Sequence, residues 1–178
     1  MTPVIQTKTA GVVPFGKRSQ LVSSLSFRRA IWFFPIAFTL HVLDEYPQFI
    51  AWAQHYASPQ FTRSDYLRIH IAGIVGAFIA SAVIAYFPNR PVVFLFLTFI
   101  FTPAVFYNTL FHSGSTIYFG VYCPGMISAL LLYPPLFWFV SWCAHREGLI
   151  SPRVGSFSLV ISGVFHLIEV GHNVFKAW

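Results

Sequence analysis

The sequence predicts an all-α fold, a polytopic transmembrane helical bundle with about five spans; four to six are compatible with its apolar runs. Hydrophobic residues make up 56% of the 178 residues and charged residues only 9%, whereas soluble domains carry about 25% charged residues. Several apolar runs reach the ~20 residues that a helix needs to cross the hydrocarbon core of a bilayer. Because the runs are continuous and do not alternate between polar and apolar residues, helices are expected in place of barrel strands.

The apolar runs place the five spans at residues 30–54, 67–87, 91–113, 124–145 and 155–177. The pair Pro134-Pro135 predicts a kink in the fourth span, because proline cannot donate a helical hydrogen bond. The connections are too short for a second domain. Residues 30–178 are therefore expected to form a single transmembrane helical domain that follows an N-terminal tail, residues 1–29.

The distribution of basic residues predicts the orientation of the chain. The tail carries five basic residues and no acid, which is typical of a basic cytoplasmic tail or of an organellar transit peptide. With the N-terminus inside, the inner side holds Lys8, Lys17, Arg18, Arg28, Arg29, Arg90, Arg146 and Arg153, and the outer side holds Arg63, Arg68 and Lys176. The positive-inside tendency then predicts a cytoplasmic N-terminus and an outer C-terminus. The net charge of +6 is thus explained by topology and by anionic lipid headgroups, so the expected partner is the bilayer and not a nucleic acid.

Ionisable residues inside the apolar runs are the unusual feature of this sequence. Three of the five acids and five of the seven histidines lie there: Asp44, Glu45, Glu169, His41, His70, His112, His166 and His172. A charged side chain at the centre of a bilayer costs ~3 kcal/mol on insertion scales. By their positions within the spans, all these residues fall in the outer half of the bilayer. A functional polar centre in that half is therefore predicted.

Helical spacing and side-chain chemistry indicate a metal site at this centre. His41 and Glu45 are i,i+4 neighbours, and Glu169 and His172 have the Glu-x-x-His spacing with which helical bundles aim two metal ligands inward. Imidazole and carboxylate groups suit zinc or iron. The predicted metal ligands are His41, His166, His172, Glu45 and Glu169. The predicted catalytic residues are Glu45, Glu169 and Asp44, and the supporting polar residues are His70, Asn108 and His112.

Plainer interpretations of single residues stay open. His70 or His112 alone can act as a polar contact between helices, without any further role. Asp44 and Glu45 can lie in a water-facing segment if Pro47 breaks the first helix.

A short motif adds a family resemblance. Residues 41–45, His-Val-Leu-Asp-Glu, read as His-x-x-acid-Glu and precede an aromatic stretch. Residues 108–112 run from Asn to His, and residues 122–125, Tyr-Cys-Pro-Gly, open the next span. Over residues 30–135 the sequence resembles the HXXEE-motif family, small integral membrane proteins of uncharacterised function. Asp44 stands where the family motif has Glu, and its shorter side chain argues against a ligand role there. The resemblance implies a membrane protein with a polar motif and supplies no chemistry.

The leading functional hypothesis is a metal-dependent membrane enzyme that acts on a lipid or another apolar small molecule. One or two divalent ions, zinc or iron, would be bound, and a remaining carboxylate would act as general base. A metal-free isomerase or cyclase would use Glu45 and Glu169 as acid and base. A b-type haem protein would use His41 and His166 as axial ligands. A proton-coupled transporter is the third alternative, although its polar pathway should continue into the inner half of the bilayer.

Overall fold

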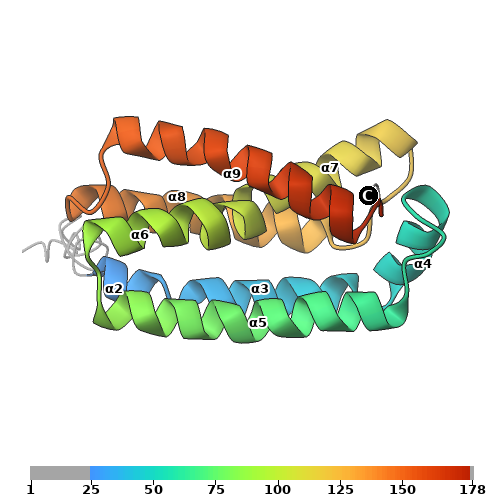
Figure 1. Cartoon of the computed structure of the whole chain (residues 1–178), viewed down its shortest axis with the longest axis horizontal. Coiled ribbons are helices and arrows are strands. Elements are labelled where there is room, and N and C mark those ends of the chain that lie inside the picture. The colour runs from blue at the N-terminus through green and yellow to red at the C-terminus, as the bar shows by residue number, and fades with distance from the viewer. Residues whose placement is uncertain (1–24, 177–178) are drawn as a thin grey trace, which may run out of the picture.

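The computed structural model describes residues 25–176, which form helices joined by short loops, without a strand among them (Figure 1). In chain order the elements are α2 (Phe27–Ala30), α3 (Phe33–Glu45), α4 (Gln48–Tyr56), α5 (Arg63–Tyr86), α6 (Arg90–Phe96), the π-helices η1 (Leu97–Phe101) and η2 (Pro103–Tyr107), α7 (Asn108–Phe119), α8 (Met126–Arg146) and α9 (Pro152–Asn173). The prediction of an all-helical bundle is confirmed. Residues 1–24, most of the predicted tail, lie outside the described residues.

Four helical stretches of the described chain are long and apolar enough to cross a membrane. They are Arg63–Tyr86, Arg90–Phe119, Met126–Arg146 and Pro152–Asn173, and they correspond to the second to fifth predicted spans. Large apolar side chains on their outer surfaces, such as Ile79, Ile117, Trp138 and Leu167, are more exposed than buried. An outer surface of this kind would be unfavourable in water and suits a lipid environment.

The first predicted span, residues 30–54, is not one continuous helix. Helix α3 ends at Glu45, Tyr46 is extended, and α4 begins at Gln48. Pro47 explains the break, because it lacks a backbone N–H and disfavours a helical conformation for the residue before it. The first pass through the bundle is thus made by α2 and α3, and α4 turns across the end of the bundle (Figure 1).

The third helical pass differs from regular α-helix in its middle. Two π-helical segments, η1 and η2, interrupt it, and Pro103 opens the second. The missing N–H of a proline removes one helical hydrogen bond, and π-turns shift the facing of every residue that follows them. The π-helical segments end directly before Asn108, so they change the direction in which Asn108 and His112 face. By contrast, α8 runs from Met126 to Arg146 with Pro134 and Pro135 inside it.

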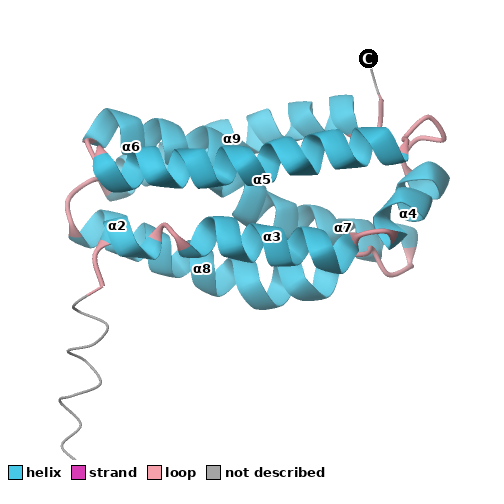
Figure 2. Cartoon of the chain, turned by 90° about the horizontal axis from the view of Figure 1, so that it is seen from below, coloured by secondary structure: helices cyan, strands magenta, loops and turns pink. Residues whose placement is uncertain are grey.

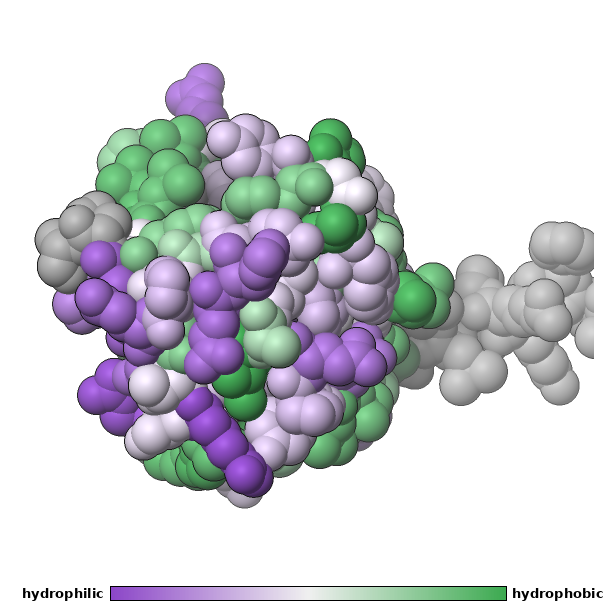
Figure 3. All heavy atoms as spheres, turned by 90° about the vertical axis from the view of Figure 1, so that its right-hand side faces the viewer, coloured by the Kyte–Doolittle hydropathy of each residue, from purple (hydrophilic) through white to green (hydrophobic). Residues whose placement is uncertain are grey.

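Helix α3 lies against α5 and α8, α7 lies against α8, and α9 packs on the π-helical segments η1 and η2. The connecting loops gather at the two ends of the bundle (Figure 2). The end of α3, the start of α5, and the ends of α7 and α9 all lie at the end that carries α4 (Figure 1). Seen from this end, hydrophilic residues gather on the surface of the molecule (Figure 3). Lys176 pairs there with Asp65 at 3.5 Å and joins the segment after α9 to the first turn of α5.

Candidate metal centre

Three imidazole rings from three helices surround the carboxylate of Glu45. His41 Nε2 and His112 Nε2 lie 3.5 and 3.4 Å from Glu45 Oε2. His70 Nε2 lies 2.7 Å from the other carboxylate oxygen, Oε1. Helix α3 contributes His41 and Glu45, α5 contributes His70, and α7 contributes His112. The carboxylate is 2% exposed, so this cluster is a buried polar centre within the bundle.

Helix geometry explains which acid of the motif turns inward. His41 and Glu45 are four residues apart and therefore share a face of α3. Asp44 is one residue earlier, about 100° around the helix, and its side chain is exposed. The two neighbouring acids thus have opposite environments, and only Glu45 belongs to the cluster.

Two of the rings are oriented by hydrogen bonds from their other nitrogen. Ser128 Oγ donates to the carbonyl of Gly125 at 3.0 Å, so it accepts the hydrogen bond from His41 Nδ1 at 2.9 Å. His70 Nδ1 lies 2.8 Å from the carbonyl of Tyr66, which can only accept. Both rings therefore carry a proton on Nδ1 and turn Nε2 toward Glu45. Hydrogen bonds of this kind fix the tautomer and orientation of metal-binding histidines in proteins.

The ring of His112 is held in a similar way by the loop before α8. Its Nδ1 lies 3.3 Å from the sulfur of Cys123. Burial, together with the charge of Glu45, raises the pKa of the Cys123 thiol, so the sulfur stays protonated and neutral. The Cys123 sulfur therefore supports the ring of His112.

The two oxygens of Glu45 face different groups. Oε1 is held by His70 Nε2 and by the hydroxyl of Tyr66, which lies 3.0 Å away. Oε2 faces His41 and His112, and His41 Nε2 is buried without a hydrogen-bond partner among the described residues. A lone pair beside a carboxylate oxygen is a favourable environment for a cation.

The spacing of these atoms fits a metal ion. One ligand atom each from His41, Glu45 and His112 lie within 4.8 Å of one another. Around a tetrahedral zinc ion with bonds of ~2.0–2.1 Å, two ligand atoms are separated by ~3.4 Å. The separations of 3.5 and 3.4 Å at Glu45 Oε2 match this value. His41, Glu45 and His112 could therefore hold one ion, with His70 and Tyr66 orienting the carboxylate.

Gly125 closes one side of the cluster. Its φ of +89° is a left-handed conformation that favours glycine. A Cβ at this position would lie 2.9 Å from Glu45 Cβ, 2.9 Å from His41 Cε1 and 3.0 Å from His112 Cε1. Only a residue without a side chain allows the loop before α8 to approach the centre this closely.

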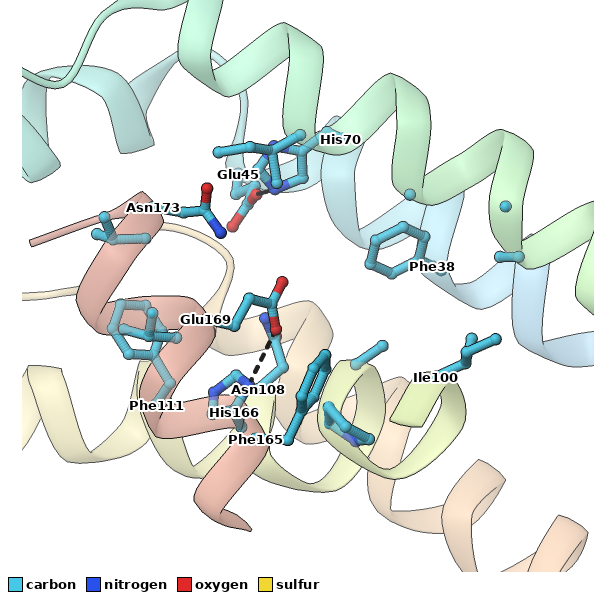
Figure 4. Close-up of a pocket in the computed structure, with 18 of the residues that line it drawn as sticks. Phe38, Glu45, His70, Ile100, Asn108, Phe111, Phe165, His166, Glu169 and Asn173 are labelled. Carbon is cyan, nitrogen blue, oxygen red and sulfur yellow. Dashed lines mark ion pairs between the residues drawn. The ribbon is translucent and has the colours of Figure 1, made fainter. Parts of the chain in front are cut away.

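The cluster opens on a cavity of about 370 Å³. Glu45, His70 and His112 line it, whereas His41 is not among its lining residues. Figure 4 shows Glu45 and His70 on one wall, with Asn108, His166, Glu169 and Asn173 on the facing wall. The carboxylate of Glu169 points into the space between the two walls (Figure 4). Phe38 and Ile100 lie farther along the cavity, which becomes apolar in that direction (Figure 4).

The structure divides the predicted site residues among different positions. His41 and Glu45 come together with His112 and His70, which were expected only as supporting polar residues. His166 and Glu169 form a separate pair on α9, with His166 Nδ1 3.7 Å from Glu169 Oε2. His172 and Asp44 are exposed.

Sequence reasoning missed the residues that orient the cluster. Tyr66, Ser128 and Gly125 are far from His41 in sequence and carry no helical spacing that would connect them with it. A Cys-Pro-Gly sequence before an apolar run is a turn signal at residues 123–125, and it could have indicated a close backbone approach.

Comparison with known families identifies the motif. The family model described as a protein of unknown function with HXXEE motif matches residues 32–140. The chain belongs to the HXXEE family. The matched range contains all four residues of the cluster and ends before α9, which carries His166 and Glu169. The His and the final Glu of the family motif are the two motif residues that meet in the buried centre. Neither the curated proteins nor the solved structures contain a match to this chain.

Proposed function

We propose that this HXXEE protein is an integral membrane enzyme that uses a divalent metal ion, zinc or iron, on an amphiphilic or lipid-like substrate. His41, Glu45 and His112 would bind the ion. The observation that carries the proposal is the convergence of two imidazole nitrogens on one buried carboxylate oxygen, at separations of 3.5 and 3.4 Å. The cavity beside these residues would hold the substrate.

Three protein ligands leave a fourth position for water or substrate, as in catalytic zinc sites. Because Glu45 and His112 line the cavity, a substrate bound there would lie next to two of the three ligands. A bound ion would supply a Lewis acid and lower the pKa of a bound water. Glu169, on the facing wall, is the remaining carboxylate and would act as the general base. Metal-assisted hydrolysis of an acyl compound is the reaction class that these groups support best.

The proposed location is a membrane in which the chain crosses from a cytoplasmic N-terminus to an outer C-terminus. The four long apolar helices support the membrane location. The excess of basic residues at the end opposite α4 supports the orientation. The metal centre would then lie toward the outer side, near the ends of α3 and α9.

Metal analysis of detergent-purified protein tests the metal site. Variants of the adjacent acids Glu45 and Asp44 are compared, and the Asp44 variant is the control. We expect about one zinc or iron per chain in the wild type, because the described residues form one such ligand set. Glu45→Gln should remove nearly all of it, since an amide cannot bind the ion as an anion. Asp44→Asn should keep the wild-type content, because Asp44 is exposed and outside the cluster. Both variants should stay monodisperse in size-exclusion chromatography. A wild type without metal, together with a Glu45→Gln variant that aggregates, would indicate a purely structural carboxylate.

A metal-free acid–base enzyme is the second candidate, and one contact favours it. His70 Nε2 lies 2.7 Å from Glu45 Oε1, while its Nδ1 already donates to a backbone carbonyl. A proton must therefore lie between His70 and Glu45, and it could be passed to a substrate in the cavity. A wild type that holds no metal, with Glu45→Gln folded but inactive, would favour this candidate. An absorption spectrum of the same sample distinguishes both candidate enzymes from a haem protein, because haem absorbs visible light.

A further inference from the structure

The wall of the cavity that faces the metal centre carries a second set of polar groups. His166 is 8% exposed, and both of its ring nitrogens are buried without a hydrogen-bond partner among the described residues. Its distance of 3.7 Å from Glu169 is too long for a hydrogen bond. The side-chain oxygen of Asn108 is also buried, and no described residue forms a hydrogen bond with it. Buried polar atoms normally have partners, and leaving one without any costs free energy.

The position of these groups is built into the fold. The π-helical segment η2 ends directly before Asn108 and sets its facing. The ring of His166 stacks on Tyr107 with a centroid separation of 6.0 Å, and the Tyr107 hydroxyl donates to the carbonyl of Leu159 at 2.7 Å. Asn108 and His166 are thus fixed at the cavity wall.

We infer that this wall binds the polar head of a single-chain amphiphile, through a hydroxyl or amine group. The unpartnered oxygen of Asn108 and the carboxylate of Glu169 are acceptors, so they require a ligand with hydrogen-bond donors. Glu45 and Glu169 line the cavity, and no lysine or arginine is among its described lining residues. A phosphate or carboxylate head is therefore disfavoured on this wall.

The rest of the cavity fits the tail of such a ligand. Away from the polar groups, the lining is apolar and includes Phe34, Phe38, Phe99, Ile100 and Ala77. The volume of about 370 Å³ is at the lower end of small-molecule sites, which favours one chain over a two-chain phospholipid. The inference deepens the proposed function, and rests on it in one respect: the ligand shares its cavity with the metal centre.

Gly76 offers a way to block the tail region without touching the polar wall. It lines the cavity, and a Cβ added to it would meet no atom within 4 Å. A phenylalanine at this position would fill space that the tail needs. Gly114 is a matched control, because it is also helical and exposed, and an added Cβ there meets no atom within 4 Å.

Binding of radiolabelled 1-dodecanol, dodecylamine and dodecanoate to the full chain in lipid nanodiscs tests the inference. Empty nanodiscs give the background. We expect the alcohol and the amine to bind about tenfold more tightly than the carboxylate, which lacks donors and is repelled by Glu169. Asn108→Leu should weaken alcohol binding about tenfold. His166→Phe, which keeps the stacking on Tyr107, should do the same. Gly76→Phe should abolish binding of all three probes, and Gly114→Phe should bind them as the wild type does.

Two results would overturn the inference: dodecanoate binding as tightly as dodecanol to chelator-treated protein, in which no metal can hold the carboxylate, or unchanged binding in both Asn108→Leu and Gly76→Phe. Metal analysis of the same samples separates this inference from the proposed function. A wild type that binds dodecanol but holds no metal would contradict the metal enzyme and sustain the head-group site. A wild type that holds metal but binds no probe would contradict the head-group site alone.

Discussion

Asp44 and Glu45 are adjacent and carry the same charge, but the structure gives them opposite environments. Glu45 has three imidazoles and a phenol around it, whereas Asp44 lies about 100° around the helix and is exposed. In the HXXEE family motif, the position of Asp44 is therefore outside the buried cluster. This explains how an aspartate can stand at that position without disturbing the centre.

The residues of the cluster could be predicted from the sequence only in part. His41 and Glu45 were found because their spacing places them on one face and because buried charge is costly in an apolar run. Helical spacing also grouped His166, Glu169 and His172 with them, but spacing within a helix does not say which helices are neighbours. His112 lies next to Glu45 because α3 and α7 both pack against α8. The sequence does not reveal this tertiary arrangement.

Replacement of Glu169 tests whether the residues on the wall opposite Glu45 are separate from the metal ligands. We expect Glu169→Gln to keep the metal content of the wild type, because the nearest partner of this carboxylate is His166 and not a residue of the metal cluster. Activity should fall, since an amide cannot accept a proton near neutral pH. Metal stoichiometry measured beside Glu45→Gln checks this expectation. Loss of metal in Glu169→Gln would show that His166 and Glu169 belong to the ligand set after all.

The apolar runs predicted the positions of the long helices, and the structure departs from these predictions at prolines. Four runs became the four long helices, because a run of this length buries its backbone polar groups only as a helix in lipid. The run over residues 30–54 was divided at Pro47, and Pro103 opens a π-helical segment. In contrast, α8 continues through Pro134 and Pro135. Sequence alone does not distinguish these outcomes, since they depend on which neighbours satisfy the freed backbone groups.

The loop between α7 and α8 has two glycines that separate backbone strain from steric blocking. Gly120 and Gly125 both have positive φ, at +67° and +89°. An added Cβ at Gly120 meets no atom within 4 Å, whereas at Gly125 it meets Glu45, His41 and His112. We expect Gly120→Ala to cost ~1 kcal/mol of stability through backbone strain. Gly125→Ala should cost a further ~1–3 kcal/mol through overpacking, and should lower the metal content.

The Tm and the metal content of the two glycine variants, in the same detergent, check this prediction. If both substitutions change the metal content equally, the close approach of Gly125 to the cluster has no particular role in metal binding.

At the level of the whole molecule, successive passes place the loops alternately at the two ends of the bundle (Figure 1). The described basic residues are unevenly divided between them: Arg28, Arg29, Arg90, Arg146 and Arg153 at one end, and Arg63, Arg68 and Lys176 at the other. The first group lies at the end opposite α4. The polar cluster lies toward the α4 end, where α3 ends and α5 begins.

Reporter fusions test the proposed orientation. Fusions after residues 60 and 118 should report the outer side, and fusions after residues 90 and 150 should report the cytoplasm, because basic loops stay inside. A fusion after residue 178 should again report the outer side. Matching signals from residues 90 and 118 would contradict a membrane crossing by α6 to α7, and a uniformly inverted pattern would contradict the orientation.

X-ray absorption at the metal edge of the purified wild-type protein tests the central claim most directly, that His41, Glu45 and His112 bind one ion. We predict a first shell of nitrogen and oxygen atoms alone at ~2.0–2.1 Å, with outer-shell scattering from two imidazole rings. A sulfur shell at ~2.3 Å would instead assign Cys123 as a ligand. A protein without any metal at the edge would contradict the metal centre itself.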